Sequence, residues 1–246
     1  MKKTLTVLTV CALASVFVAS ASAGPWYARG DYYCAPGCWG ADGGNELFDD
    51  GLHGDGAAGD GVYGCDTSPD QNPGRYDFKI ALGDWSSSFP GSNQWVHVSG
   101  AADIIHFSLD TNSHGDGWIP DQNIVWNSHF APAGTAFEVV GGPPEIGAWG
   151  SGLAGVLNGD IWSVTVPIAA TGTHESKWRA VGSWDVQNIG GDGGASAGGN
   201  LTFEVTTAGT PVLFEFNQAT GRSRVTVDPP VSVDDASWGS VKGTYK

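Results

Sequence analysis

GTHESKWRAVGSW, residues 172–184, repeats a pattern that the chain already uses in GRYDFKIALGDW, residues 74–85. In each stretch a lysine opens a mainly apolar segment, and a glycine then precedes a tryptophan by two positions. The lysine and tryptophan that frame the pattern are Lys79 and Trp85 in the first copy, and Lys177 and Trp184 in the second. A unit of this size that occurs twice predicts a tandem duplication rather than a solenoid.

The segments around the repeated stretch also follow the same order in both parts of the chain. A loop that ends in Trp-Gly precedes each copy, CAPGCWG at 34–40 and PPEIGAWG at 143–150. We therefore predict two domains, over 24–130 and 131–228, with a C-terminal tail over 229–246.

Strand patterns predict the fold class. In LTFEVT, residues 201–206, apolar side chains alternate with polar ones, which is the period of a half-buried strand. The segment IWSVTVPI, residues 161–168, places Trp162 on one face with three aliphatic side chains. Short strands separated by Gly, Pro and Asp clusters are typical of β-sandwiches. The expected fold is all-β, with two tandem immunoglobulin-like β-sandwiches.

The N-terminus has the features of a secretory signal peptide. MKK is followed by an apolar run and then by SASAG, a small-residue cleavage site, so we expect cleavage after Ala23. The apolar run is shorter than a membrane span requires. The sequence therefore predicts a secreted protein, extracellular or periplasmic, without membrane insertion.

The charge of the chain excludes some classes of partner. Acidic residues number 26 against 11 basic ones, which gives a formal net charge of −15. Nucleic acids and anionic membranes are bound by cationic surfaces, so neither is an expected partner. The chain also has 38 glycines and 11 tryptophans, more turn and indole residues than a core of this size needs.

Three cysteines remain after the predicted cleavage. Pro36 and Gly37 form a turn dipeptide between Cys34 and Cys38, which predicts a disulfide between these two. Cys65 is then left free or paired between molecules. A zinc site is the alternative, but no histidine has suitable spacing.

FEVVGGPPEIGAWG and IWSVTVPIAATGTHESKWRAVGSWD, within residues 135–228, resemble the starch-binding domains of glucoamylases and the immunoglobulin-like accessory domains of pullulanases. Residues 25–121 are similar to the pullulanase type. The resemblance implies that Trp149 and Trp184 form an aromatic platform for sugar, with Lys177 donating a hydrogen bond beside it. The matching residues of the first copy are Trp39, Lys79 and Trp85.

The chemistry of tryptophan agrees with a sugar site. Sugars present C–H faces and hydroxyl edges, so their sites need flat apolar rings with polar groups around them. A turn can hold such a ring away from the sheet. The alternative is that the rings close the ends of the cores, the role we predict for Trp126 and Trp162. Two weak sites on one chain would bind a polymer with avidity.

Two loops rich in aspartate are candidate metal-binding sites. FDDGLHGDGAAGDGVYG holds several aspartates among glycines. DTNSHGDGWIPD places oxygen-bearing side chains at positions 1, 3, 7 and 12 of an EF-hand-like loop: Asp110, Asn112, Asp116 and Asp121. Position 5 is His114, a poor calcium ligand. Ca²⁺ in this loop is one expectation, and ordinary Asp-Gly turns are the other.

The sequence contains no zinc-protease or phosphate-loop motif. Glu145 and Glu175 lie in the binding repeat, so we do not assign them a glycosidase role. The predicted function is non-catalytic binding of an α-glucan polymer. The alternative is a structural or adhesive module of a surface layer or filament that assembles with itself.

Overall fold

The computed structural model describes residues 24–35, 37–100, 102–195 and 199–229. The predicted signal peptide and residues 230–246 of the predicted tail lie outside the described residues. The described chain confirms an all-β protein made of antiparallel sheets, with a single turn of 3-10 helix, η1 (Pro144–Ile146). Among these residues, no helix has the length and apolar character needed to cross a bilayer.

The first half, residues 24–127, contains two antiparallel sheets. One has the strand order β2 (Glu46–Leu47), β1 (Trp26–Gly30), β4 (Gly74–Leu82), β5 (Ser88–Val98). The other has the order β3 (Val62–Thr67), β6 (Ile105–Asp110), β7 (Ile124–Asn127). Alternating side chains from these strands form one hydrophobic core, with Tyr32, Phe78 and Phe107 fully buried at its centre.

The second half, residues 128–229, also contains two sheets. One has the order β10 (Val156–Asn158), β11 (Ile161–Ile168), β15 (Thr210–Asn217), β16 (Arg222–Val227). The other has the order β13 (Asn188–Ile189), β12 (Gly172–Ala180), β8 (Phe137–Gly141), β9 (Leu153–Ala154), and β14 (Leu201–Val205) pairs with β12. A separate core lies between them, and Trp126 and Trp162 pack against it as predicted.

The two lysines that begin the repeated stretch occupy matching places in their sheets. On β4, Lys79 pairs with Arg29, the residue before the glycine that ends β1. On β12, Lys177 pairs with Val140, the residue before the glycine that ends β8. In both ladders the lysine points away from the core, because the residues beside it, Phe78 and Trp178, point into it.

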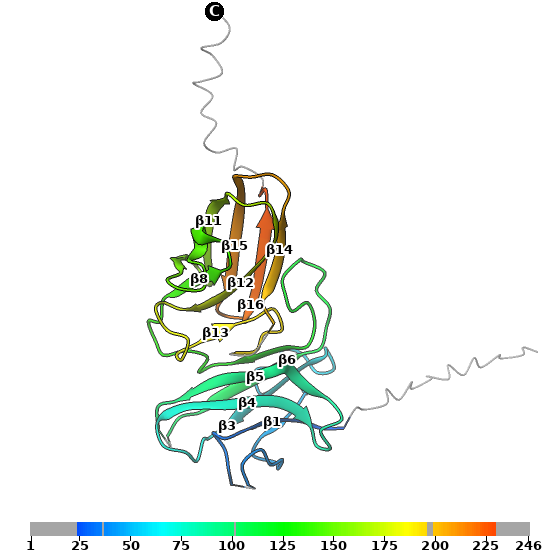
Figure 1. Ribbon diagram of the computed structural model, residues 1–246. Coiled ribbons are helices and arrows are strands. Elements are labelled where there is room, and N and C mark those ends of the chain that lie inside the picture. Colours follow the sequence, from blue (N-terminus) through cyan, green and yellow to red (C-terminus); the bar gives the residue numbers. More distant parts are fainter. Residues whose placement is uncertain (1–23, 36, 101, 196–198, 230–246) are drawn as a thin grey trace, which may run out of the picture.

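The two halves meet along β5, as Figure 1 shows where that strand lies beneath the β13 segment. Ser92 donates to Asp192 Oδ2 through both its backbone N–H (3.1 Å) and its hydroxyl (2.7 Å). Gln94 Nε2 donates to the carbonyl oxygen of Gly193 at 2.9 Å. These bonds join the edge of the first half to the segment that follows β13.

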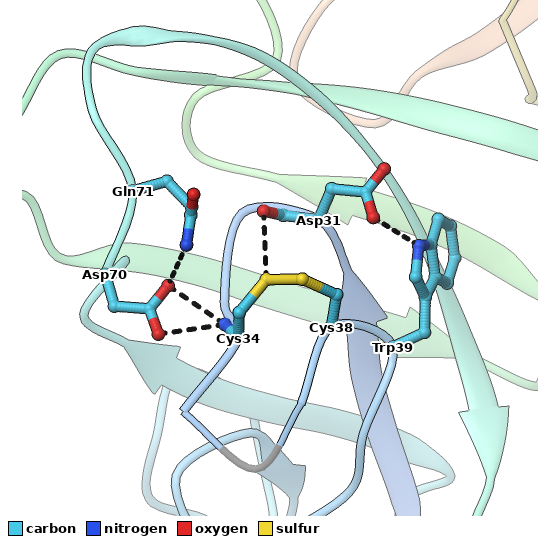
Figure 2. The surroundings of a disulfide bond; sticks show 6 residues. All are labelled: Asp31, Cys34, Cys38, Trp39, Asp70 and Gln71. Atoms are coloured by element: carbon cyan, nitrogen blue, oxygen red, sulfur yellow. Dashed lines mark hydrogen bonds between the residues drawn. A yellow bond between two sulfur atoms is a disulfide. The ribbon is translucent and has the colours of Figure 1, made fainter.

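The predicted disulfide between Cys34 and Cys38 is confirmed, with an S–S distance of 2.02 Å. Figure 2 shows how the bridged loop is held. The backbone N–H of Cys34 donates to both carboxylate oxygens of Asp70 at 2.9 Å, and Trp39 Nε1 donates to Asp31. The bridge therefore fixes the loop that carries Trp39.

Cys65 is free and buried, and burial raises the pKa of its thiol to about 12. Because only the thiolate attacks disulfide reagents, we expect native protein to react slowly with dithiobis(nitrobenzoate) at pH 8. In denaturant the same thiol should react within minutes. Peptide mapping identifies the modified residue, and rapid labelling of Cys65 in native protein would contradict the prediction.

Candidate functional site

In the second half, a tight loop after β8 presents Trp149. Gly147 ends η1 in the left-handed region, at φ 89°, and a Cβ there would overlap the carbonyl oxygen of Ser151. Only glycine fits this position. The chain then turns back, and Trp149 N–H donates to Gly141 O at 2.8 Å. The indole of Trp149 is left 37% exposed.

Trp184 lies in the turn that follows β12, and its side chain is also 37% exposed. Ser183 N–H donates to Ala180 O at 3.0 Å, and Asn188 Nδ2 donates to Trp184 O at 3.1 Å. The next residue, Asp185, has a side chain that is 94% exposed. This carboxylate pairs with Arg75 at 3.8 Å and is otherwise in solvent, where it can accept hydrogen bonds from hydroxyl groups.

Arg179 connects the loops of Trp149 and Trp184. Its guanidinium lies 4.2 Å from the centroid of the Trp184 ring, within cation–π range. It donates to the carbonyl oxygen of Gly150, the residue after Trp149, and its Nε donates to Glu138 Oε1 at 2.7 Å. The ion pair with Glu138 is buried, with side-chain exposures of 5% and 6%.

In the first half the two indoles lie close together. The rings of Trp39 and Trp85 have centroids 6.2 Å apart and planes tilted by 40°. Trp85 is 43% exposed, and Trp39 is half-buried. Arg29 lies 4.2 Å from the centroid of Trp85, and its Nε donates to the carbonyl oxygen of Gly40, the residue after Trp39, at 3.3 Å.

Neither arginine was among the predicted site residues. In sequence, Arg29 stands in the short β1 segment and Arg179 inside the repeated stretch, and neither belongs to the repeated lysine–tryptophan pattern. The strand alternation does place both arginines on the outward face of their sheets. That outward position beside an exposed tryptophan is the signal that could have identified them.

The lysines are placed differently from what the resemblance implies. Lys177 is only 4% exposed, and its Nζ donates to Asn188 Oδ1 at 3.3 Å. Burial lowers the pKa of Lys177, an effect partly opposed by Asp192. β13 pairs with β12 in the same sheet and brings Asn188 to the amine, so little of Lys177 is accessible to a sugar. Lys79 is half-buried and donates to the carbonyl oxygen of Gly91.

The cations near the four indoles therefore have partners within the protein. Arg179 binds Glu138 and Gly150, and Arg29 donates to the carbonyl oxygens of Gly40, Leu82 and Gly83. Both lysines also donate to protein oxygens. What each site offers to a ligand is an exposed ring that is next in sequence to an exposed aspartate, Asp84 before Trp85 and Asp185 after Trp184. Such a surface suits an uncharged, hydroxyl-rich molecule better than an anion.

The carboxylates of the predicted calcium loop each have other partners. Asp116 forms a bidentate ion pair with Arg222 of β16, with N–O distances of 2.6 and 2.8 Å. This ion pair lowers the pKa of Asp116 well below its usual range. Asp110 accepts from His114 at 2.8 Å, and Asp121 accepts from the backbone N–H of Gly115 at 2.7 Å. Among the described residues, no group of three or more acidic, His or Cys side chains is arranged to hold a metal. Calcium binding by Asp110, Asn112, Asp116 and Asp121 stays a prediction.

Comparison with known proteins assigns no relative, because no protein-family profile and no curated protein matches the chain. The assignment of the site therefore rests on its geometry and on the residues that resemble starch-binding domains.

Proposed function

We propose that this protein is a secreted, non-catalytic carbohydrate-binding protein, with two immunoglobulin-like domains that each bind an α-glucan polymer through a pair of tryptophans. Trp149 and Trp184 form the stronger site, and Trp39 and Trp85 the weaker. The starch-type ligand comes from the sequence resemblance, which is clearest in the second half.

The backbone conformation of the tryptophans is the observation that carries the proposal. Trp39, Trp85 and Trp149 have φ values of 64°, 63° and 64°, in the left-handed region that bulky residues rarely adopt. Such a conformation costs about 1–3 kcal/mol, and it persists where the surrounding structure enforces it, commonly at binding sites. Here the cost leaves Trp85 and Trp149 43% and 37% exposed and Trp39 half-buried, and none of the three belongs to a hydrophobic core. A role in contacting a ligand accounts for both features.

The charge of the surroundings favours a neutral glycan. The chain has a formal net charge of −15, so a sulfated or uronic-acid polymer would be repelled. The arginines and lysines near the indoles are bound to protein oxygens. Exposed aspartates such as Asp185 can instead accept hydrogen bonds from neutral hydroxyl groups.

The expected affinity explains why two sites would be useful. Two indoles that each cover about 80–100 Å² of sugar contribute roughly 4–5 kcal/mol at ~25 cal/mol/Å², before the costs of association. This corresponds to about millimolar binding at one site. Two sites on one chain increase retention on a polymer by raising the effective concentration at the second site.

A second candidate function has its own structural support. β10 is the edge strand of its sheet, and it exposes Val156 and Leu157, which are 71% and 43% accessible. An apolar edge strand can pair with a second chain. This feature favours a structural or adhesive module that assembles through its sheets.

A pull-down separates the two proposals. Protein from Gly24 onward is incubated with granular starch, with cellulose and chitin as controls, and its association state is measured in parallel by sedimentation. We expect retention on starch and little on the controls. If the protein binds none of the polymers but associates as its concentration rises, the assembly proposal is favoured instead.

A further inference from the structure

We propose that Arg29 and Arg179 are positioning residues, each of which fixes the two tryptophan-bearing loops of its half as one surface. The inference rests on the proposed function, because the surface they fix is the proposed sugar site. Neither arginine contacts the ligand in this proposal. Each acts through the loops that carry the rings.

The two arginines make the same two contacts. Each places its guanidinium 4.2 Å from the ring centroid of the second tryptophan of its pair, Trp85 or Trp184. Each also donates to the carbonyl oxygen of the glycine that follows the first tryptophan, Gly40 or Gly150. One cation thus bridges two loops that are otherwise far apart in sequence.

The arginines reach these contacts from different strands. Arg179 belongs to β12 and pairs with Glu138, while Arg29 belongs to β1 and pairs with Lys79. The β4 residue that occupies the place of Arg179 is Ala81, which pairs with Tyr27. The shared contacts therefore do not follow from matching positions in the two copies. Two different strand positions thus supply the same bridge. This indicates that the bridge contributes to positioning the tryptophan loops.

The position of each guanidinium also determines which face of the ring can meet a ligand. Arg29 is 7% exposed and Arg179 is 4% exposed, so each guanidinium that contacts a ring is buried. The covered face of Trp85 or Trp184 is thereby filled, and the opposite face is left for the sugar. A ring held in this way loses less conformational freedom when it binds.

The charges of the two arginines are accommodated differently. Glu138 accepts from Arg179 Nε at 2.7 Å and also from the backbone N–H of Gly182, in the Trp184 loop, at 3.1 Å. Removing Arg179 would leave a buried carboxylate without its partner and would destabilise the fold. Arg29 donates to backbone carbonyl groups, so its replacement leaves no such charge behind.

These different partners determine which substitution is suitable at each arginine. Arg29→Met keeps an apolar stem and removes the guanidinium. Arg179→Lys keeps a cation opposite Glu138 but cannot donate in two directions while lying flat on the ring. The matched control is Arg224→Lys, because Arg224 lies 4.6 Å from the Trp118 centroid, outside both tryptophan pairs. Lysine also keeps a cation opposite Glu215, to which Arg224 Nε donates at 2.7 Å. Each variant is examined for starch affinity, acrylamide quenching of tryptophan fluorescence and melting temperature.

We expect Arg29→Met and Arg179→Lys to remain folded, to weaken starch binding about three- to tenfold, and to make indole fluorescence more accessible to acrylamide. Arg224→Lys should match the unmodified protein in starch affinity. Unchanged affinity and quenching in the two folded variants would overturn the proposal. If the unmodified protein does not bind starch, the proposed function fails, and the quenching result alone then decides whether the arginines position the rings.

Discussion

Replacing Trp149 or Trp184 with alanine is expected to weaken starch binding by about 1–3 kcal/mol, roughly ten- to hundredfold, as loss of a base–aromatic stack does in nucleic-acid binding. Each ring is 37% exposed, so a sugar can cover a large apolar face that alanine lacks. Depletion binding to granular starch, measured over a range of protein concentrations, gives the affinity of each variant.

The same experiment includes Trp39→Ala and Trp85→Ala, which should lose less retention because we assign the weaker site to the first half. Melting temperatures should stay close to that of the unmodified protein, since neither Trp149 nor Trp184 belongs to the buried core. Folded variants of Trp149 and Trp184 with undiminished retention would show that the ligand is bound elsewhere. Variants that unfold would show that these rings support the core.

The fold class was predictable because it depends on local sequence. Alternation in segments such as LTFEVT reports which face of a strand is buried, and the structure places Leu201, Phe203 and Val205 in the core. The disulfide was predictable for the same reason, since Cys34 and Cys38 are close in sequence. Short-range features of this kind need no knowledge of the tertiary structure.

The environment of the site depends on long-range contacts, and these were not predictable. Arg179 meets Glu138 across 41 residues, and Arg222 meets Asp116 across 106. No local pattern pairs such residues. The contact with Arg222 gives Asp116 a structural role that loop spacing alone could not reveal.

The burial of Lys177 has a similar cause. Alternation correctly places Lys177 on the face of β12 opposite to Trp178. That face would be exposed if β12 were the last strand of the sheet. The following glycine-rich segment begins with β13, which pairs with β12, and it brings Asn188 and Asp192 towards the amine. NIGGDGG has no strand alternation, so its sequence gives no sign that its first two residues pair with β12.

Trp178→Ala should have the largest effect on stability, about 3–5 kcal/mol, because it removes a fully buried indole from the core of the second half. The Trp178 ring lies 6.1 Å from that of Phe216, and a Cβ built on Gly155 would lie only 2.9 Å from it, so the surroundings are closely packed. A loss of this size is a large part of the 5–15 kcal/mol that stabilises a typical protein.

Trp178→Phe is the matched control, and it should cost less than Trp178→Ala. Phenylalanine refills most of the volume, and the buried Nε1 of Trp178 has no hydrogen-bond partner among the described residues that would be lost. Urea unfolding, followed by circular dichroism, measures the free energy of unfolding of each variant. Trp184→Ala should unfold near the midpoint of the unmodified protein, whereas Trp178→Ala should unfold at a much lower urea concentration. If the two alanine variants had equal midpoints, the division of these neighbouring tryptophans into a core residue and a binding residue would be wrong.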